Sequence, residues 1–366
     1  MEKSKKGELP SNTGEFNFSE QNLKFKEIIS KNMYSGGNND SFEIFQSIKN
    51  KDIYLAFPNK NDYTLDIITI KNNKLFISLK SHNNYIILVK YFGNNTKEYL
   101  FSSDKYNDII IWDVLNKFSF VDKIKARTNK GLISGILIFI NTKIILNEIN
   151  KVNDYIIISY NDKNYTNIYS LNNPKILKSF KKTNEYATYC LLEWNYRKNN
   201  KNYIIELSNA NIFIYNINNC NLEFILTLGS YDYSKTNSGF IYRKNNEDFL
   251  IVSSSSGIIS IFNLETKKII SHIYLYEDYD HFYSYLNRIN ISYILQWSEK
   301  YLIACEYYKQ GFKIINMDNL DKLKIITSVN EEHTGGVLFA KKFYHPIYGE
   351  SLLTSGKDNC IILWSV

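Results

Sequence analysis

The sequence predicts an all-β protein, a seven-bladed β-propeller built from seven four-stranded repeats. Three observations support this prediction. A short apolar strand recurs seven times, the copies lie about 49 residues apart on average, and no window of 11 to 18 residues keeps the apolar spacing of a helix. The recurring strands are LDIITI (65–70), IIIWDV (109–114), TNIYSL (166–171), IFIYNI (212–217), IISIFNL (258–264), FKIINM (312–317) and IILWSV (361–366). They align in one mostly aromatic column: Thr69, Trp112, Tyr169, Tyr215, Phe262, Ile315 and Trp364.

Each repeat supplies further β-rich segments around this third strand. The expected second strands are DIYLAF, EYLFSS, DYIIIS, NYIIEL, DFLIVS, KYLIAC and ESLLTS. The expected first strands are SFEIFQSI, YIILVKYF, GILIFI, YATYCLLEW, GFIYR, ISYILQW and GVLFAKKF. A fourth strand follows six of the seven copies: KLFISLK, FSFVDKI, KILKSF, EFILTL, IISHIYL and KLKIIT.

Length and composition agree with a repeat architecture. A chain of 366 residues exceeds the usual size of one compact core, and 15% aromatic residues suit half-buried pleated sheets. Residues 1–22 are rich in Ser, Asn, Lys and Glu, so we expect a disordered N-terminal tail. The predicted domains are therefore this tail (1–22) and the propeller (23–366).

The expected compartment follows from what the sequence lacks. The N-terminus has no apolar signal region, and the longest apolar runs fall far short of a membrane span. Cys190, Cys220, Cys305 and Cys360 lie far apart without a C-x-x-C pair, so reduced thiols are expected. These features predict a cytoplasmic protein without membrane insertion, with the nucleus left open.

The positive charge is a weak indication of nucleic acid. The formal net charge is +7, but nearly all of the basic residues are Lys and only four are Arg, the residue that grips phosphate or guanine with a planar fork. Abundant Asn, Lys, Ile and Tyr also fit the codon bias of an AT-rich genome. The composition therefore disfavours nucleic acid as the partner.

The last repeat carries a family resemblance. Residues 332–366 contain His333, Thr334, Ser355, Asp358 and Trp364 at the spacing of a WD40 repeat. Residues 82–113 resemble the repeat less closely, with His82, Ser103 and the Trp112-Asp113 pair, because Tyr106 stands where an Asp is expected. The resemblance extends over residues 23–366 as a WD40-like propeller, and it implies a role in binding other proteins.

The resemblance also implies a hydrogen-bonded structural tetrad in the last blade, made of His333, Ser355, Asp358 and Trp364. A buried Trp N–H and a buried His need such partners. Ser, His and Asp in one segment also suggest a hydrolytic triad, but no nucleophile elbow is present, so the structural interpretation is favoured.

The last blade lacks its own outer strand, because the sequence ends at Val366 directly after a third strand. Residues 23–30, LKFKEIIS, alternate apolar and polar side chains and precede the first complete repeat. We therefore predict that this N-terminal strand completes the last blade and closes the ring.

A tyrosine-rich crescent is the candidate partner-binding site. In WD40 proteins, the links from fourth to first strand and the turns from second to third strand share one rim, called the top. Three such loops are aromatic here, at 229–238, 276–287 and 306–311, and clusters of aromatic side chains are typical of binding hot spots. The crescent residues are Tyr231, Tyr233, Tyr276, Tyr279, Phe282, Tyr283, Tyr307 and Tyr308.

Catalytic and metal chemistry find little support. Asp278, Asp280 and His281 suit a metal by residue type, but a solvated acidic loop is the favoured interpretation, and no nucleotide-binding, dinucleotide-binding or zinc-protease motif is present. First strands, which line the channel of a propeller, are predominantly apolar or uncharged here. We expect no catalytic residues, no metal and no cofactor.

The predicted function is a non-catalytic scaffold that organises a multiprotein complex. It would bind other proteins through its top loops, as a monomer within the larger assembly. The alternatives are an RNA-associated propeller of a ribonucleoprotein, which strong salt dependence of RNA binding would favour, and a propeller enzyme, which would need convergent carboxylates or histidines.

Overall fold

The computed structural model shows an all-β chain of four-stranded antiparallel sheets. It describes residues 23–34, 41–125, 133–143, 152–160, 165–170, 176–181, 188–209, 211–228, 235–275, 290–330 and 332–366. The strands pair in seven sheets, and within six of them the order follows the chain. Contacts divide the chain into two compact units, and each is described separately.

The first unit comprises Met1–Thr128, Lys309–Phe312 and Thr327–Val366. One sheet contains β2 (Glu43–Gln46), β3 (Ile53–Pro58), β4 (Leu65–Thr69) and β5 (Lys74–Leu79). The next contains β6 (Ile86–Gly93), β7 (Glu98–Asp104), β8 (Asp108–Asp113) and β9 (Ser119–Lys125). The third joins β1 (Lys24–Ser30) to β26 (Val337–His345), β27 (Gly349–Gly356) and β28 (Ile361–Ser365).

The second unit comprises Asn129–Tyr308 and Lys313–Ile326. Its strands are β10 (Ile133–Lys143), β11 (Val152–Tyr160), β12 (Tyr165–Ser170), β13 (Ile176–Lys181), β14 (Cys190–Tyr196), β15 (Lys201–Leu207), β16 (Asn211–Asn216), β17 (Leu222–Thr227), β18 (Thr236–Lys244), β19 (Glu247–Ser254), β20 (Ile258–Asn263) and β21 (Lys268–Tyr274). The last sheet contains β22 (Ile291–Gln296), β23 (Tyr301–Glu306), β24 (Phe312–Asn316) and β25 (Lys324–Val329), and most of it belongs to this unit.

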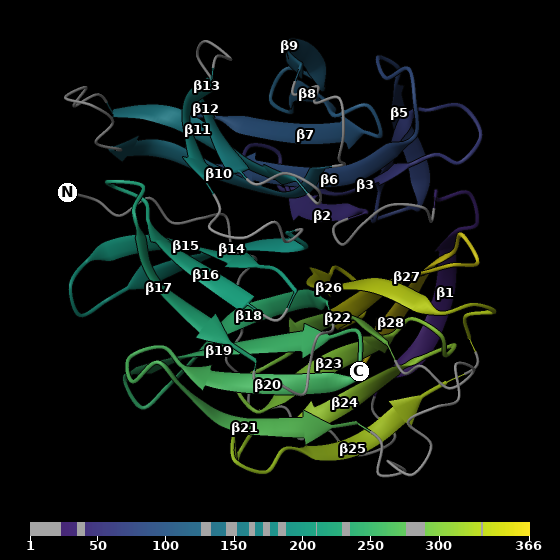
Figure 1. The fold of residues 1–366 in the computed structure, drawn as a ribbon. Coiled ribbons are helices and arrows are strands. Elements are labelled where there is room, and N and C mark those ends of the chain that lie inside the picture. Colours follow the sequence, from purple (N-terminus) through teal and green to yellow (C-terminus); the bar gives the residue numbers. More distant parts are fainter. Residues whose placement is uncertain are drawn as a thin grey trace. The chain divides into compact units, whose positions relative to one another are not determined.

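The predicted pairing of the N-terminal strand with the last blade is confirmed. β1 runs antiparallel to β28, with Lys24 opposite Ser365 and Phe25 opposite Trp364. In Figure 1 the purple β1 lies beside the yellow β27 and β28, although it is the first strand of the chain. The Phe25 ring also meets the Trp364 ring edge-on, with centroids 6.3 Å apart.

This pairing predicts different effects for two N-terminal truncations. Removing residues 1–30 leaves β28 as an open edge and Trp364 without Phe25, so we expect the Tm to fall by about 5 °C or more. Removing residues 1–22, the predicted tail, should leave the Tm unchanged because β1 stays intact. Thermal unfolding followed by circular dichroism measures both. An equal Tm for the two truncated proteins would contradict a stabilising role for β1.

The prediction of a seven-bladed propeller is wrong. Seven four-stranded sheets are present in the backbone pairing, but only six are described as complete blades, with side-chain burial along all four strands. For the sheet β10–β13, burial is described for only some of the side chains. The fold is therefore an all-β propeller with six complete blades and one further sheet.

A bulge recurs at the same point of the repeat. In five sheets the pairing of third and fourth strands shifts directly before one residue: Ile68, Trp112, Tyr169, Tyr215 and Phe262. Four of these five residues belong to the column predicted from the sequence. In the first blade the equivalent residue is Ile68, one position before the predicted Thr69. Ile68 is buried and Thr69 is partly exposed, so burial decides the register there.

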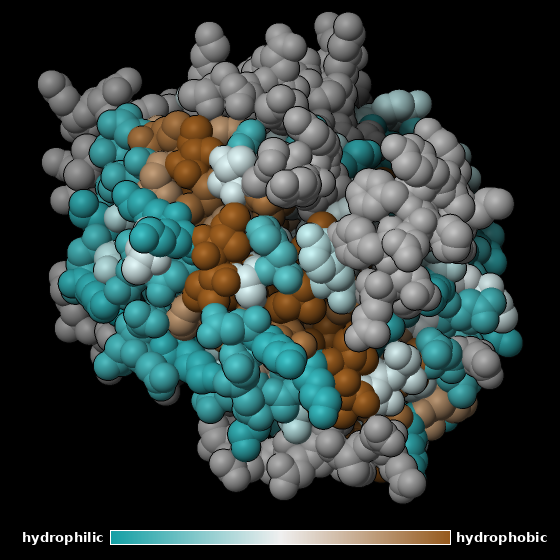
Figure 2. Space-filling model, turned by 60° about the horizontal axis from the view of Figure 1, so that its bottom comes forward, coloured by the Kyte–Doolittle hydropathy of each residue, from teal (hydrophilic) through white to brown (hydrophobic). Residues whose placement is uncertain are grey.

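The cores lie between neighbouring sheets. In the first unit, Phe45, Leu65, Val89 and Trp112 belong to one buried cluster that joins β2–β5 to β6–β9. Fourth strands are more exposed, and on β5 Leu75 is 60% exposed. Figure 2 shows hydrophobic residues in brown reaching the surface in a band bordered by hydrophilic residues in teal. Inner strands therefore carry the core, and outer strands leave apolar side chains at the surface.

Candidate functional site

A buried polar network crosses the last blade. The Trp364 indole N–H on β28 donates to the Thr354 hydroxyl on β27, at 2.8 Å. That hydroxyl lies 2.9 Å from His333 Nε2, and His333 Nδ1 lies 3.0 Å from a carboxylate oxygen of Asp358. The network therefore links three of the four predicted tetrad residues, and its hydroxyl comes from Thr354.

Ser355 does not belong to this network, which corrects the predicted tetrad. Trp364 pairs with Leu352 across β27 and β28, and Thr354 lies two residues further along β27. Side chains alternate between faces along a strand, so Thr354 shares a face with Leu352 and Ser355 points to the other face. The buried Ser355 hydroxyl has no hydrogen-bond partner among the described residues.

Asp358 is the charged member of the network. Its carboxylate also accepts hydrogen bonds from the backbone N–H groups of Thr334 and Cys360, at 2.9 and 3.0 Å. Burial by itself would raise the pKa of Asp358, but the hydrogen bond and charge of His333 and these backbone donors lower it below its usual value. Asp358 therefore joins His333 to the turn between β27 and β28.

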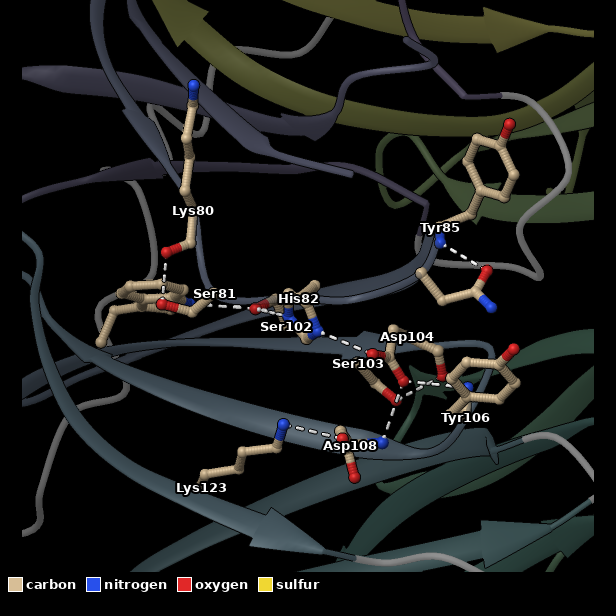
Figure 3. Close-up of polar contacts among 12 residues, drawn as sticks. Lys80, Ser81, His82, Tyr85, Ser102, Ser103, Asp104, Tyr106, Asp108 and Lys123 are labelled. Carbon is tan, nitrogen blue, oxygen red and sulfur yellow. Dashed lines mark hydrogen bonds and ion pairs between the residues drawn. The ribbon is translucent and has the colours of Figure 1, made fainter. Parts of the chain in front are cut away.

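A second network of the same kind lies in the blade β6–β9. Figure 3 shows His82 between Ser102 and Asp104, with Nε2 2.7 Å from the Ser102 hydroxyl and Nδ1 3.2 Å from the Asp104 carboxylate. The Trp112 indole N–H donates to Ser102 at 2.9 Å. The sequence pattern pointed to Ser103 for the hydroxyl and left the Asp position to Tyr106. The structure supplies both missing parts one or two residues earlier, from Ser102 and Asp104.

The two networks place their carboxylates at different positions of the turn. Counted from the hydroxyl and the tryptophan, Asp104 occupies the position of Gly356, and Tyr106 that of Asp358. A Cβ atom on Gly356 would lie 2.5 Å from His333 Nδ1 and 2.6 Å from Asp358 Oδ1, so a side chain there would compete with the Asp358 carboxylate. One carboxylate at either position satisfies the histidine, and a second would collide with it.

The polar groups of both networks form hydrogen bonds with one another inside the fold. The Thr354 and Ser102 side chains are fully buried, and each hydroxyl is held between an indole N–H and an imidazole nitrogen. A nucleophile needs access to its substrate and an activating base that is free to take its proton. These arrangements stabilise blades and do not resemble a reaction centre.

Charged residues also occur on the first strands of the first unit, where the sequence led us to expect few. Lys341 on β26 forms an ion pair with Glu43 on β2. Glu98 on β7 accepts from the hydroxyls of Ser47 and Tyr91, at 3.2 and 3.0 Å. Burial, followed by the charge of Glu98, raises the pKa of Tyr91 above its usual range, so Tyr91 stays a donor. Both carboxylates are held by these structural partners.

The tyrosine crescent is described only in part. Tyr231, Tyr233, Tyr276, Tyr279, Phe282 and Tyr283 lie outside the described residues. Tyr307 and Tyr308 lie in the turn between β23 and β24, with ring centroids 4.9 Å apart and planes nearly perpendicular. Tyr308 is 59% exposed, so its ring is accessible to a partner. Asp278, Asp280 and His281 also lie outside the described residues.

Sequence reasoning missed another aromatic cluster, which lies in the first unit. The rings of Tyr34 and Tyr85 are stacked with centroids 4.4 Å apart, and Tyr63 meets Tyr85 edge-on at 4.7 Å. The Lys105 ammonium lies 5.0 Å from the centre of the Tyr34 ring. Tyr34 and Tyr85 are 51 positions apart in the sequence. Nothing in the sequence shows that their two loops are adjacent, so the cluster could not be predicted from it.

His345 is a buried histidine at the C-terminal end of β26. Its Nδ1 accepts from the backbone N–H groups of Ile347 and Tyr348, at 3.1 and 3.2 Å, and its Nε2 has no partner among the described residues. Burial lowers the pKa of His345 below the ordinary value of 6.5, and the charge of Glu27 acts in the opposite direction. The folded protein therefore favours the neutral imidazole.

This lowered pKa predicts a pH dependence of stability. The unfolded state binds the proton more tightly, so the contribution of His345 is complete above about pH 6.5 and is lost as the pH falls through the lowered folded value. The His345→Asn variant keeps an acceptor for the two backbone donors without titrating. We expect its Tm to fall less than that of the wild type between about pH 7.5 and 5.5. Parallel Tm curves for the two proteins would contradict this role.

Comparisons with known proteins identify the fold and no family. No family model matches the sequence, and no curated protein matches it. Among solved structures, Raptor from Chaetomium thermophilum matches with a TM-score of 0.64 and 12% identity over 94% of this chain, which spans only 29% of the Raptor chain. BBS1N in complex with ARL6DN, soaked with lead, matches with a TM-score of 0.65 and 10% identity, covering 92% of this chain and 94% of that one. The same complex soaked with mercury gives a TM-score of 0.61 and 10% identity, covering 90% and 92%.

These likenesses, together with the four-stranded sheets, define the class of protein: the chain is an all-β β-propeller protein. Across the described part of the chain, no helix is long and apolar enough to cross a membrane. Within the same residues, no group of three or more His, Cys, Asp or Glu side chains is arranged to hold a metal ion.

Proposed function

We propose that this chain is a WD40-like, non-catalytic scaffold that binds other proteins through the loops of one rim. The observation that carries this proposal is the contrast between its polar and aromatic residues. The His, Asp and hydroxyl groups of the two networks are buried and paired, whereas Tyr308, Tyr106 and Tyr63 are exposed in turns between second and third strands. Exposed tyrosines on rigid turns bind partners at a low cost in ordering.

A structural neighbour supports a role in protein complexes. BBS1N, which has a similar fold, was crystallised in complex with ARL6DN. We infer that this chain likewise belongs to a larger assembly, as a single copy in the cytoplasm. The β-propeller fold serves many purposes, so the rim residues must carry the specificity.

Tyr308 provides the first test of the scaffold. In Tyr308→Ala we expect the affinity for a captured protein partner to fall about five- to thirtyfold, the effect of losing a hot-spot aromatic side chain. The measurement is affinity capture with the tagged full chain, followed by titration of the partner. Tyr344→Ala is the matched control, because Tyr344 is also exposed but lies on β26, at 41% exposure.

The outcomes separate the candidate functions. A wild-type chain that captures no protein at all would contradict the scaffold. Partners that disappear on ribonuclease treatment, together with RNA binding that weakens steeply with salt, would favour the ribonucleoprotein alternative. Equal losses in Tyr308→Ala and Tyr344→Ala would remove Tyr308 from the binding site.

A further inference from the structure

We propose that a lysine–tyrosine rim of the first unit is a docking site for an acidic peptide segment of a partner protein. The rim consists of Tyr34, Lys60, Tyr63, Tyr85, Lys105 and Tyr106. The proposal rests on the scaffold function above, and it adds a second binding surface, made of other residues than the tyrosine crescent, and the chemistry of the segment that binds there.

Backbone hydrogen bonds hold the loops of this rim together. The Tyr34 N–H donates to the carbonyl of Pro58 at 2.8 Å, and the Lys60 N–H donates to that of Asn32 at 2.9 Å. The Lys105 N–H donates to the Tyr85 carbonyl at 3.0 Å. These bonds fix the segment after β1 to the β3–β4 turn, and the loop before β6 to the turn between β7 and β8. The Tyr34–Tyr85 and Tyr63–Tyr85 ring contacts join the two pairs. A partner would meet a surface that is already ordered, which reduces the entropic cost of binding.

The buried network lies directly beneath one of these loops. Asp104 accepts from the backbone N–H groups of Tyr106 and Asp108, at 2.9 and 3.1 Å, and so fixes the turn that carries Lys105 and Tyr106. Figure 3 shows Tyr106 and Tyr85 at the Asp104 end of the network. The tetrad of this blade therefore positions the side chains of the rim.

The aromatic side chains of the rim are packed and yet accessible. Tyr106 is 57% exposed and Tyr63 is 39% exposed, although Tyr63 meets the Tyr85 ring edge-on. Tyr63 also adopts a φ of 58°, in the left-handed region that bulky residues rarely occupy. Such backbone conformations persist where the surroundings enforce them and are frequent at binding sites. The turn thus presents a large aromatic side chain where glycine or asparagine would be less strained.

The charge of the rim favours an acidic partner. Lys105 lies over the Tyr34 and Tyr85 rings, which holds its ammonium group near these tyrosines, and the Lys60 ammonium donates to the Lys31 carbonyl at 3.2 Å. Asp104 in the turn below is fully buried against His82, which leaves Asp62 as the exposed carboxylate of the β3–β4 turn. Carboxylates of a bound peptide would pair with Lys60 and Lys105, while an apolar residue packs on Tyr63 and Tyr106.

The same surface is poorly suited to single-stranded nucleic acid. Bases bind proteins by stacking on open aromatic faces. Here Tyr34 and Tyr85 stack on each other, with planes 9° apart, and the Lys105 ammonium lies over both rings. The cations of the rim are lysines, which lack the planar fork of arginine. These contacts favour an acidic peptide over RNA.

Fluorescence anisotropy with the full chain tests the proposal. The probe is a fluorescein-labelled peptide of about ten residues, mostly Glu and Asp with Leu and Phe, and its counterparts are the same peptide with Lys for each acid and an oligouridine of similar length. We expect the acidic peptide to bind at least about tenfold more tightly than either, and its affinity to fall as salt is raised. Preferential binding of oligouridine, or equal affinity for the basic peptide, would overturn the proposal.

Variants locate the binding on the rim. Lys105→Gln and Tyr106→Ala should each weaken the acidic peptide about three- to tenfold, while Lys105→Arg keeps most of the affinity. The controls are Lys74→Gln and Tyr344→Ala, which change exposed residues of the same types elsewhere. Both rim variants, at the half-buried Lys105 and the exposed Tyr106, should keep a Tm close to that of the wild type, which shows that they fold. Equal losses in rim and control variants would overturn the assignment of the site.

One more comparison separates this proposal from the scaffold itself. Captured proteins that the Lys105→Gln/Tyr106→Ala double variant retains in full would remove the rim as a docking site and leave the scaffold standing. Proteins lost from the double variant but retained by the control variants would support the rim. A wild-type chain without protein partners would contradict the scaffold, whatever the peptide does.

Discussion

Replacing Thr354 with valine will destabilise the protein by about 3 kcal/mol, although the two side chains have nearly the same shape. The hydroxyl of Thr354 joins the Trp364 indole N–H to His333. Valine would leave two buried polar groups without a partner, and each such group costs about 1–3 kcal/mol. Urea unfolding followed by tryptophan fluorescence measures this loss.

Ser355→Ala is the matched control, because Ser355 is the next residue of the same strand and is equally buried. Its hydroxyl has no partner among the described residues, so we expect a change within about 0.5 kcal/mol, or a slight gain in stability. If Ser355→Ala proves as harmful as Thr354→Val, the hydroxyl of the tetrad has been assigned to the wrong residue.

Asp104→Ala will destabilise the protein by about 3–5 kcal/mol, because each buried group left without its hydrogen-bond partner costs about 1–3 kcal/mol. The variant deprives His82 and the backbone N–H groups of Tyr106 and Asp108 of their acceptor. We expect the free energy of unfolding, measured in urea, to fall by that amount. A loss comparable with that of an exposed substitution would contradict the network.

The last blade suggests a rescue for this variant. There, Gly356 occupies the position equivalent to Asp104, and Asp358 occupies the position equivalent to Tyr106. The double variant Asp104→Gly/Tyr106→Asp should therefore recover at least about half of the stability that Asp104→Gly alone loses. Asp104→Gly/Tyr106→Asn has the same shape without the charge and should recover less. Equal recovery by both would show that the carboxylate is not what matters.

Much of the strand order followed from the sequence. The apolar segments at regular spacing marked the third strands, and the alternation in residues 23–30 predicted a strand that pairs with the last blade, as β1 does. Period and alternation are properties of the local sequence, so they can be recognised without a structure. The same period predicted a seven-bladed propeller, which was wrong, because six complete blades are described.

Individual site residues were less predictable. In both networks the hydroxyl was assigned one residue too late, to Ser355 and Ser103, where the structure uses Thr354 and Ser102. A shift of one residue turns a side chain to the opposite face of a sheet. The chain offers two adjacent hydroxyl residues at each place, and only pairing with the tryptophan strand decides between them.

Some candidate binding residues were predictable from the sequence and others were not. The sequence identified loops rich in tyrosine, and Tyr308 is indeed well exposed. It gave no sign of the lysine–tyrosine rim, where Tyr34, Tyr85 and Lys105 come from three loops. The Tyr34 ring contacts and the backbone hydrogen bond between Lys105 and Tyr85 join these segments, which are distant along the chain.

The sequence by itself determined that this protein is built of β-strands in four-stranded units and that its first strand pairs with its last. Those features depend on the order of apolar and polar residues along short segments. Only the tertiary structure decided which hydroxyls satisfy Trp112 and Trp364, which carboxylates meet His82 and His333, and which tyrosines stack. These outcomes depend on strand register and on contacts between loops, and a displacement of a single residue reverses them.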